Sequence, residues 1–158
     1  MAWRGQADTK DRIFGALVYI LPLIYVLPFG DFLLTQFRAL KFIYVPLQPV
    51  IQIYKAFPFA GIIIFFVLFL AVVRNERINH FIRFNTMQAI LLDILLVLLR
   101  LATQILGDGL GQNLLTQALY NVVFLGTLAA CFYAIIQSAL GRYAEMPALS
   151  EAVYGQVR

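Results

Sequence analysis

Charged residues are scarce in this sequence, and their scarcity excludes most soluble folds. Only 13% of the 158 residues are Asp, Glu, Lys or Arg, whereas 62% are apolar. A soluble domain carries about 25% charged residues and about 45–50% apolar ones, because water must wet its surface. The chain lacks that charged surface, so we expect an integral membrane protein.

Cysteine and histidine each occur once, as Cys131 and His80. A single cysteine forms no internal disulfide, and inside an apolar run it behaves as a small hydrophobic residue. A single histidine, without a second His or Cys at ligand spacing, gives no metal site. The sequence also shows no paired acids and no Ser–His or Cys–His pair at catalytic spacing. We therefore predict no enzyme activity, no metal and no cofactor.

Long apolar runs predict an all-α polytopic membrane protein with four transmembrane helices. A helix of about 20 apolar residues crosses the hydrocarbon core of a bilayer. Residues 1–158 form one membrane domain in this interpretation. The predicted spans cover residues 13–34, 57–73, 86–106 and 120–140. Residues 35–56 are an interfacial amphipathic segment between spans 1 and 2, and residues 141–158 are a C-terminal tail.

Local patterns refine this layout. Pro22 lies inside the first span and predicts a kink, because proline removes a backbone donor and clashes with the preceding turn. The interfacial segment contains a stretch with helical periodicity, with apolar positions on one face at Leu47, Val50, Ile51 and Tyr54. Such a pattern is typical of a helix in the headgroup plane. Leu149, Val153 and Val157 have the same kind of spacing and predict a short peripheral helix.

Lysine and arginine near the span ends predict the orientation. With four spans, the two termini and the second loop share one side of the membrane, where the basic residues are Arg4, Lys10, Arg12, Arg74, Arg77, Arg83, Arg142 and Arg158. The other side has only Arg38, Lys41 and Lys55. Both termini should therefore face the cytoplasm or, in a plastid, the stroma. No cleavable targeting segment or transit-like extension is evident.

The third span carries the costly residues Asp93 and Arg100. Each costs roughly 2.5–3.5 kcal/mol near a helix centre on insertion scales, so the span inserts only marginally by itself. The two residues share one helix face about 10.5 Å apart, and Gln104 continues that face. A polar face of this kind indicates either a structural clamp between helices, with Arg100 snorkelling to the interface, or the lining of a water-filled path. Both interpretations stay open.

The fourth span contains a small residue at every fourth position: Gly126, Ala130, Ala134 and Ser138. Such a ridge lets another helix backbone approach closely. The partner helix belongs either to the same bundle or to another subunit.

The stretch 74–94, RNERINHFIRFNTMQAILLDI, resembles the signature of the twenty-kilodalton subunit family of the TIC translocon at the inner envelope of chloroplasts, which has cyanobacterial relatives. The similarity is strongest at Arg83, Phe84, Asn85, Met87, Gln88, Ala89 and Asp93. The pieces LVYILPLIY and PALSEAVYGQV are also similar to the family. The resemblance implies four membrane helices, both termini stromal or cytoplasmic, and membership of a protein-translocation complex that forms or borders a protein-conducting channel. It implies no catalytic residues. Within this family, the absence of a transit-like extension favours a cyanobacterial relative.

The leading functional hypothesis is a membrane subunit of a protein-translocation or channel-like assembly. Asp93, Arg100 and Gln104 would satisfy polar groups of a partner helix or a passing chain, and Arg83, Asn85 and Gln88 would organise the start of the third span. The alternative is a structural or assembly factor for other membrane complexes in a cyanobacterium. The candidate partners are membrane lipids, other membrane subunits, a second copy and a translocating polypeptide; nucleic acid is not expected. The expected location is a cyanobacterial inner or thylakoid membrane, or the plastid inner envelope.

Overall fold

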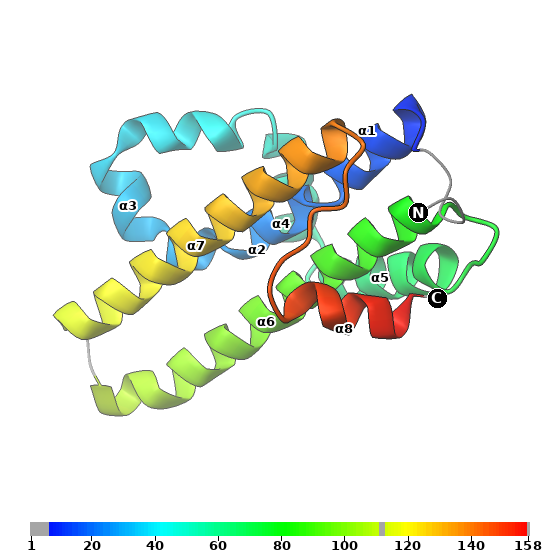
Figure 1. Ribbon diagram of the computed structural model, residues 1–158. Coiled ribbons are helices and arrows are strands. Elements are labelled where there is room, and N and C mark those ends of the chain that lie inside the picture. Colours follow the sequence, from blue (N-terminus) through cyan, green and yellow to red (C-terminus); the bar gives the residue numbers. More distant parts are fainter. Residues whose placement is uncertain (1–6, 111–112, 158) are drawn as a thin grey trace.

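The computed structural model describes residues 7–110 and 113–157 (Figure 1). Within these ranges the chain forms eight α-helices and no strand. The helices are α1 Thr9–Leu17, α2 Ile20–Tyr25, α3 Asp31–Gln36, α4 Gln48–Ala56, α5 Ala60–Leu68, α6 His80–Leu110, α7 Leu114–Ala139 and α8 Leu149–Gln156. Shorter helical turns are η2 Leu27–Phe29, η3 Arg38–Tyr44 and the π-helical turn η4 Phe69–Val73. The predicted all-α class is confirmed.

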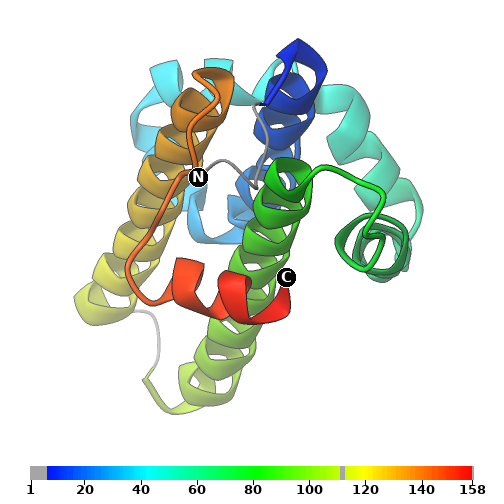
Figure 2. The ribbon, with the colours of Figure 1, turned by 45° about the vertical axis from the view of Figure 1, so that its right-hand side comes forward.

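The helices are arranged around α1 and α2, which pack against both α6 and α7 (Figures 1 and 2). Helix α5 and η4 lie on another side of α6, and α8 crosses α6 near its first half. The larger core cluster includes Tyr19 and Phe29 of the first apolar segment, Leu92 of α6 and Phe124 of α7. The first apolar segment therefore holds the two long helices together.

The first predicted span is interrupted rather than continuous. Helix α1 ends at Leu17 and α2 begins at Ile20. The break lies at residues 18–19, one turn before Pro22, which has no N–H to donate to the carbonyl of Val18. That carbonyl instead accepts a bond from the backbone N–H of Leu21 at 3.3 Å. The expected disturbance by Pro22 is thus confirmed.

Two helices of the described residues are long and apolar enough to cross a membrane, α6 over His80–Gly107 and α7 over Leu114–Ala139. Helix α4 and the α5–η4 unit qualify as a third only when taken together, and they are bent by 111° at their junction. The structure therefore gives two or three spans by this measure, not clearly the four that the sequence predicts. The difference arises because the first apolar segment is divided near Pro22 into helices that are each too short to cross a bilayer.

The ends of the long helices are fixed by local hydrogen bonds. Asn79 accepts a bond from the backbone N–H of Phe81 at 2.9 Å, as a helix N-cap does, and its amide donates to Asp11 of α1 at 2.9 Å. Helix α7 ends at Ala139 and is followed by the C-cap residue Leu140 and by Gly141, whose φ is +76°. Arg142 N–H then bonds the carbonyl of Gln137 at 2.9 Å, which closes a Schellman motif.

The two short helices that the sequence predicts outside the spans are present. Helix α4 buries Ile51 and leaves Gln52 exposed. Helix α8 buries Val153 in a second cluster with Val73 and Phe84. Their position relative to a bilayer stays a prediction, and Arg4 and Arg158, which the charge argument used, lie outside the described residues.

Gly15 is the one residue of α1 that is buried, and it tests this packing. A Cβ at this position would lie 2.9 Å from the ring of Phe81 and 3.0 Å from the amide of Asn85. Gly15→Ala should destabilise the protein by about 1–2 kcal/mol, because overpacking outweighs the gain in helix propensity. Thermal unfolding in mild detergent measures the effect. Gly155→Ala is the control, because nothing lies within 4 Å of its Cβ position; equal stability of the two variants would contradict the packing.

Candidate functional site

A buried polar network forms at the break in the first apolar segment. Its side chains are Tyr19, Asn85, Gln88, Ser138 and Ser150, and all five are buried. The Oδ1 atom of Asn85 accepts bonds from the Tyr19 hydroxyl at 2.8 Å and from the Ser138 hydroxyl at 3.0 Å. One side chain of α6 thus joins the first segment to α7.

Gln88 extends the polar network to the C-terminal part of the chain. Its Nε2 atom donates to the Tyr19 hydroxyl at 3.0 Å and to the carbonyl of Ala144 at 2.8 Å. Its Oε1 atom accepts from the Ser150 hydroxyl at 2.8 Å. That hydroxyl in turn accepts the backbone N–H of Met146 at 2.6 Å. Gln88 therefore fixes the connection after α7 and the start of α8.

Arg83 lies outside the polar network, at the junction of η4 and α6. Its Nε atom donates to the carbonyl of Val73 at 2.9 Å, and only 7% of the side chain is exposed. Val73 ends η4, where carbonyls lack a partner within the helix and favour a cation. Arg83 thus closes the turn between η4 and α6.

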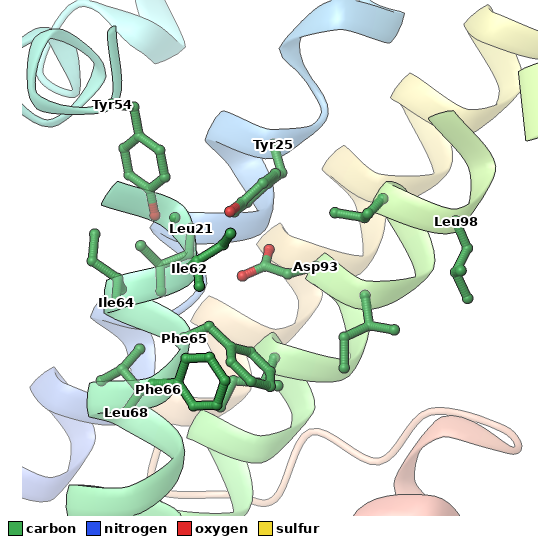
Figure 3. A pocket seen from close by; sticks show the side chains of 14 residues that line it. Leu21, Tyr25, Tyr54, Ile62, Ile64, Phe65, Phe66, Leu68, Asp93 and Leu98 are labelled. Atoms are coloured by element: carbon green, nitrogen blue, oxygen red, sulfur yellow. The ribbon is translucent and has the colours of Figure 1, made fainter. Parts of the chain in front are cut away.

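Asp93 lies deeper along α6, in a cavity of about 330 Å³ between α2, α5 and α6 (Figure 3). The walls of this Asp93 pocket are mostly aliphatic and aromatic side chains, among them Ile62, Phe65, Phe66, Ile90 and Val97. The Oδ1 atom of Asp93 is buried and has no hydrogen-bond partner in the described part of the chain. The pocket is therefore an apolar space with one acid at its wall.

Two tyrosines complete the pocket. The rings of Tyr25 and Tyr54 meet edge to face with centroids 5.7 Å apart. In Figure 3 the hydroxyl of Tyr25 and the carboxyl of Asp93 point toward the same space beside Ile62. Gly61 makes room for this arrangement, since a methyl group there would collide with the Tyr25 hydroxyl. The Tyr54 hydroxyl, like the acid, is buried without a partner among the described residues.

Arg100 and Gln104 are separated from Asp93 by this geometry. The α6 residues that line the pocket end at Leu98. Beyond it, α6 and the first turns of α7 extend past the other helices (Figure 1). We call residues 98–110 and 113–119 the projecting hairpin; Ile105 is 77% exposed in it and Leu114 84%. Arg100 and Gln104 are exposed on the hairpin, so the predicted polar face is divided between a pocket and a free surface.

The small-residue ridge of α7 is also divided. Ala134 and Ser138 are buried inside the bundle, where α7 packs against α1. Ala130 is half-buried, and Gly126 is exposed with nothing within 4 Å of its Cβ position. One end of the ridge therefore serves packing within the chain, and the other end is open.

The family model described as "Chloroplast import apparatus Tic20-like" matches residues 6–153. The chain belongs to the Tic20 family. A "Tic20 family protein" of Synechocystis sp. is 56% identical over 159 residues, which cover 100% of this chain and 99% of the relative. "Protein TIC 20-v, chloroplastic" of Arabidopsis thaliana is 36% identical, over 96% of this chain and 73% of the relative. The Ycf60 "Tic20 family protein" of Gracilaria tenuistipitata var. liui is 34% identical, over 93% and 75%.

The apolar helices and these similarities identify the chain as a membrane protein. Its named relatives include a cyanobacterial and a chloroplast protein. They confirm the family that the motif around Arg83 and Asp93 predicted. The motif residues Asn85 and Gln88 lie in the polar network, and Arg83 lies beside it at the η4–α6 junction.

Sequence reasoning missed several residues of this Tic20-family site. Tyr19 and Ser150 look like ordinary span and tail residues, although they complete the polar network. Tyr54 is an apolar position of the predicted interfacial helix and Tyr25 lies within the first predicted span, although both line the Asp93 pocket. A usable signal was available: buried Asn and Gln in an apolar span need several partners, and hydroxyl side chains of neighbouring segments are the nearest candidates.

Gln88→Met tests the polar network. Methionine fills a similar volume but leaves the Ala144 carbonyl and the Ser150 hydroxyl without the Gln88 amide, at a cost of about 2 kcal/mol or more. We expect a lower unfolding temperature in detergent and faster proteolysis near α8. Gln104→Met, the same change at an exposed position of α6, should alter neither property. Identical proteolysis of both variants would show that Gln88 does not hold α8.

Proposed function

We propose that this protein is an integral membrane subunit of a protein-translocation or channel-like assembly, which works by binding and positioning rather than by catalysis. Membership of the Tic20 family supports the proposal, because chloroplast relatives in this family carry the TIC name. The observation that carries it is the projecting hairpin. There, Arg100 and Gln104 are exposed among large apolar side chains such as Leu101.

The projecting hairpin is costly in a bilayer unless something covers it. An arginine near a helix centre costs roughly 2.5–3.5 kcal/mol on insertion scales. Such residues pair with other polar groups or reach toward the interface. A neighbouring subunit whose acceptors face Arg100 removes that cost and buries the apolar side chains around it. This is the arrangement that we propose for the assembled complex.

The proposed topology has four crossings with both termini on the cytoplasmic or stromal side. The first crossing consists of α1, α2 and η2, and the second of α5 with η4. The topology is supported because α1 lies close to the turn after η4 and to the end of α7. Asn79 bonds Asp11, and the Gly141 Cβ position lies next to Arg12. The C-terminal end of α6 and the start of α7 lie at the opposite end of the bundle (Figure 1).

Cysteine labelling tests this topology, because Cys131 is the single native cysteine. In a Cys131→Ala background, Glu76→Cys and Glu151→Cys should react with an impermeant maleimide from the cytoplasmic side of vesicles. Thr35→Cys and Leu115→Cys should react from the other side; all four positions are exposed. Labelling of Glu76→Cys and Leu115→Cys from the same side would rule out the proposed crossings.

Arg100→Leu tests the role of the projecting hairpin. The variant should insert at least as well as the native chain, since leucine favours the membrane. The native complex should nevertheless become smaller or unstable, because a partner's acceptors lose the guanidinium. Blue-native electrophoresis of membranes in which the variant replaces the native chain measures this. Arg38→Leu, at an exposed arginine outside the long helices, is the control. An unchanged complex with Arg100→Leu would show that Arg100 serves only as an anchor at the membrane interface.

The alternative role, a structural factor for other membrane complexes, is favoured by the exposed Gly126 end of the α7 ridge. A photoreactive residue at Leu101 of the projecting hairpin distinguishes the two roles in the same membranes. Crosslinks to chains in transit support the translocation role. Crosslinks to one resident complex, and to no chain in transit, support the structural role.

A further inference from the structure

The Asp93 pocket contains a hydrogen-bond acceptor that the described residues leave unused. The buried Oδ1 atom of Asp93 has no partner among the described residues, and neither does the nearby Tyr54 hydroxyl. Buried polar groups in a membrane protein normally find a partner, because hydrocarbon offers none. A hydrogen-bond donor for Asp93 is therefore expected to come from outside the described part of the chain.

The depth of the acid restricts the source of that donor. Asp93 lies about 13 residues, or roughly 20 Å, from the start of α6, well inside the apolar part of the helix. Lipid headgroups stay at the membrane interface, so they do not reach this level without taking their polar groups into hydrocarbon. A side chain on a transmembrane helix can be presented at any depth.

A second copy of the chain offers no basic side chain at the depth of Asp93. In a two-fold dimer about the membrane normal, each residue lies at the same depth as its symmetry mate. Asp93 of one copy would then lie at the same depth as Asp93 of the other copy. Arg100, the one basic residue in the predicted third span, would be about 10.5 Å away along the axis.

We propose that the Asp93 pocket receives a lysine or arginine side chain from a transmembrane helix of a different protein. The volume of about 330 Å³ holds one such side chain. Its cationic end complements the acid, and the Tyr54 hydroxyl offers a further acceptor. Ile62 and Phe66, which line the pocket and are exposed at 58% and 53%, give the partner helix apolar contacts. The inference rests on the proposed role as a subunit and names the chemistry of one partner.

Model peptides test this pairing without an identified partner. The purified protein is reconstituted into phosphatidylcholine vesicles with a polyleucine transmembrane peptide carrying one central lysine, or with the same peptide without lysine. A central lysine stays at the same depth whichever way the peptide inserts. Energy transfer from a dye on Glu151→Cys, in a Cys131→Ala background, to an acceptor on the peptide reports binding.

The lysine peptide should bind at least fivefold more tightly than the all-leucine peptide. Asp93→Asn should abolish the preference, whereas Asp31→Asn, the same change at an exposed position, should leave it. Ile62→Trp, which keeps the acid and fills the pocket, should also abolish it. Equal binding of the two peptides to the native protein, or a preference that survives Asp93→Asn, overturns the proposal.

Two further outcomes identify a different occupant and also overturn the proposal. One is no peptide preference together with Asp93-dependent labelling by a photoreactive long-chain amine, which assigns the pocket to an amphiphile. The other is no peptide preference together with Asp93-dependent self-association, which assigns it to a second copy. Failure of the peptide test leaves the result for Arg100→Leu standing, so the two proposals are judged separately.

Discussion

The structure depends on the requirement that polar groups inside a membrane protein find partners within the protein. Pro22 breaks the first apolar segment, and the break brings Tyr19 against Asn85 and Gln88 of α6. The side chains of Asn85 and Gln88 then bind three neighbouring elements: the first segment, α7 through Ser138, and α8 through Ser150. A defect in one helix is thus compensated by a polar network that joins four segments.

Helix α6 has two different halves, and they suit different tasks. Its first half is surrounded by α1, α2, α5 and α8, and its polar residues Asn85 and Gln88 are satisfied inside the chain. Its second half projects beyond these helices and exposes Arg100. Asp93 lies between the halves, at the wall of a cavity, and its buried Oδ1 atom has no hydrogen-bond partner within residues 7–110 and 113–157. The first half organises the subunit, and the second is available to others.

Much of this arrangement could be predicted from the sequence. The apolar runs gave α6 and α7, and helical spacing gave α4 and α8, because periodicity depends only on local residue order. Pro22 predicted a disturbance, but not that the first span would divide into α1, α2 and η2. The 111° bend between α4 and α5 was not foreseen either, since apolar composition does not define the direction of a helix. These misses concern how segments turn, which tertiary packing decides.

The candidate site was predicted in its polar residues on α6 but not in their partners. Asn85, Gln88, Asp93 and Arg100 stand out because polar residues are costly in an apolar span. A single face for Asp93, Arg100 and Gln104 also follows from helix geometry. The sequence does not reveal that the α6 residues facing α5 across the pocket end at Leu98. It therefore could not place Asp93 in a pocket and Arg100 on the projecting hairpin. Hydroxyl partners such as Tyr19 and Ser150 come from distant segments, and no local pattern marks them.

The polar network has a consequence for biosynthesis. Gln88 is synthesised and inserted long before the ribosome reaches Ala144 and Ser150, which hold both ends of its amide in the folded protein. During that interval the Tyr19 hydroxyl can already accept a bond from the Nε2 atom, whereas the Oε1 atom depends on water, lipid or an assisting protein until Ser150 is made. Residues synthesised late, Ala144 and Ser150, therefore complete the polar network around Gln88.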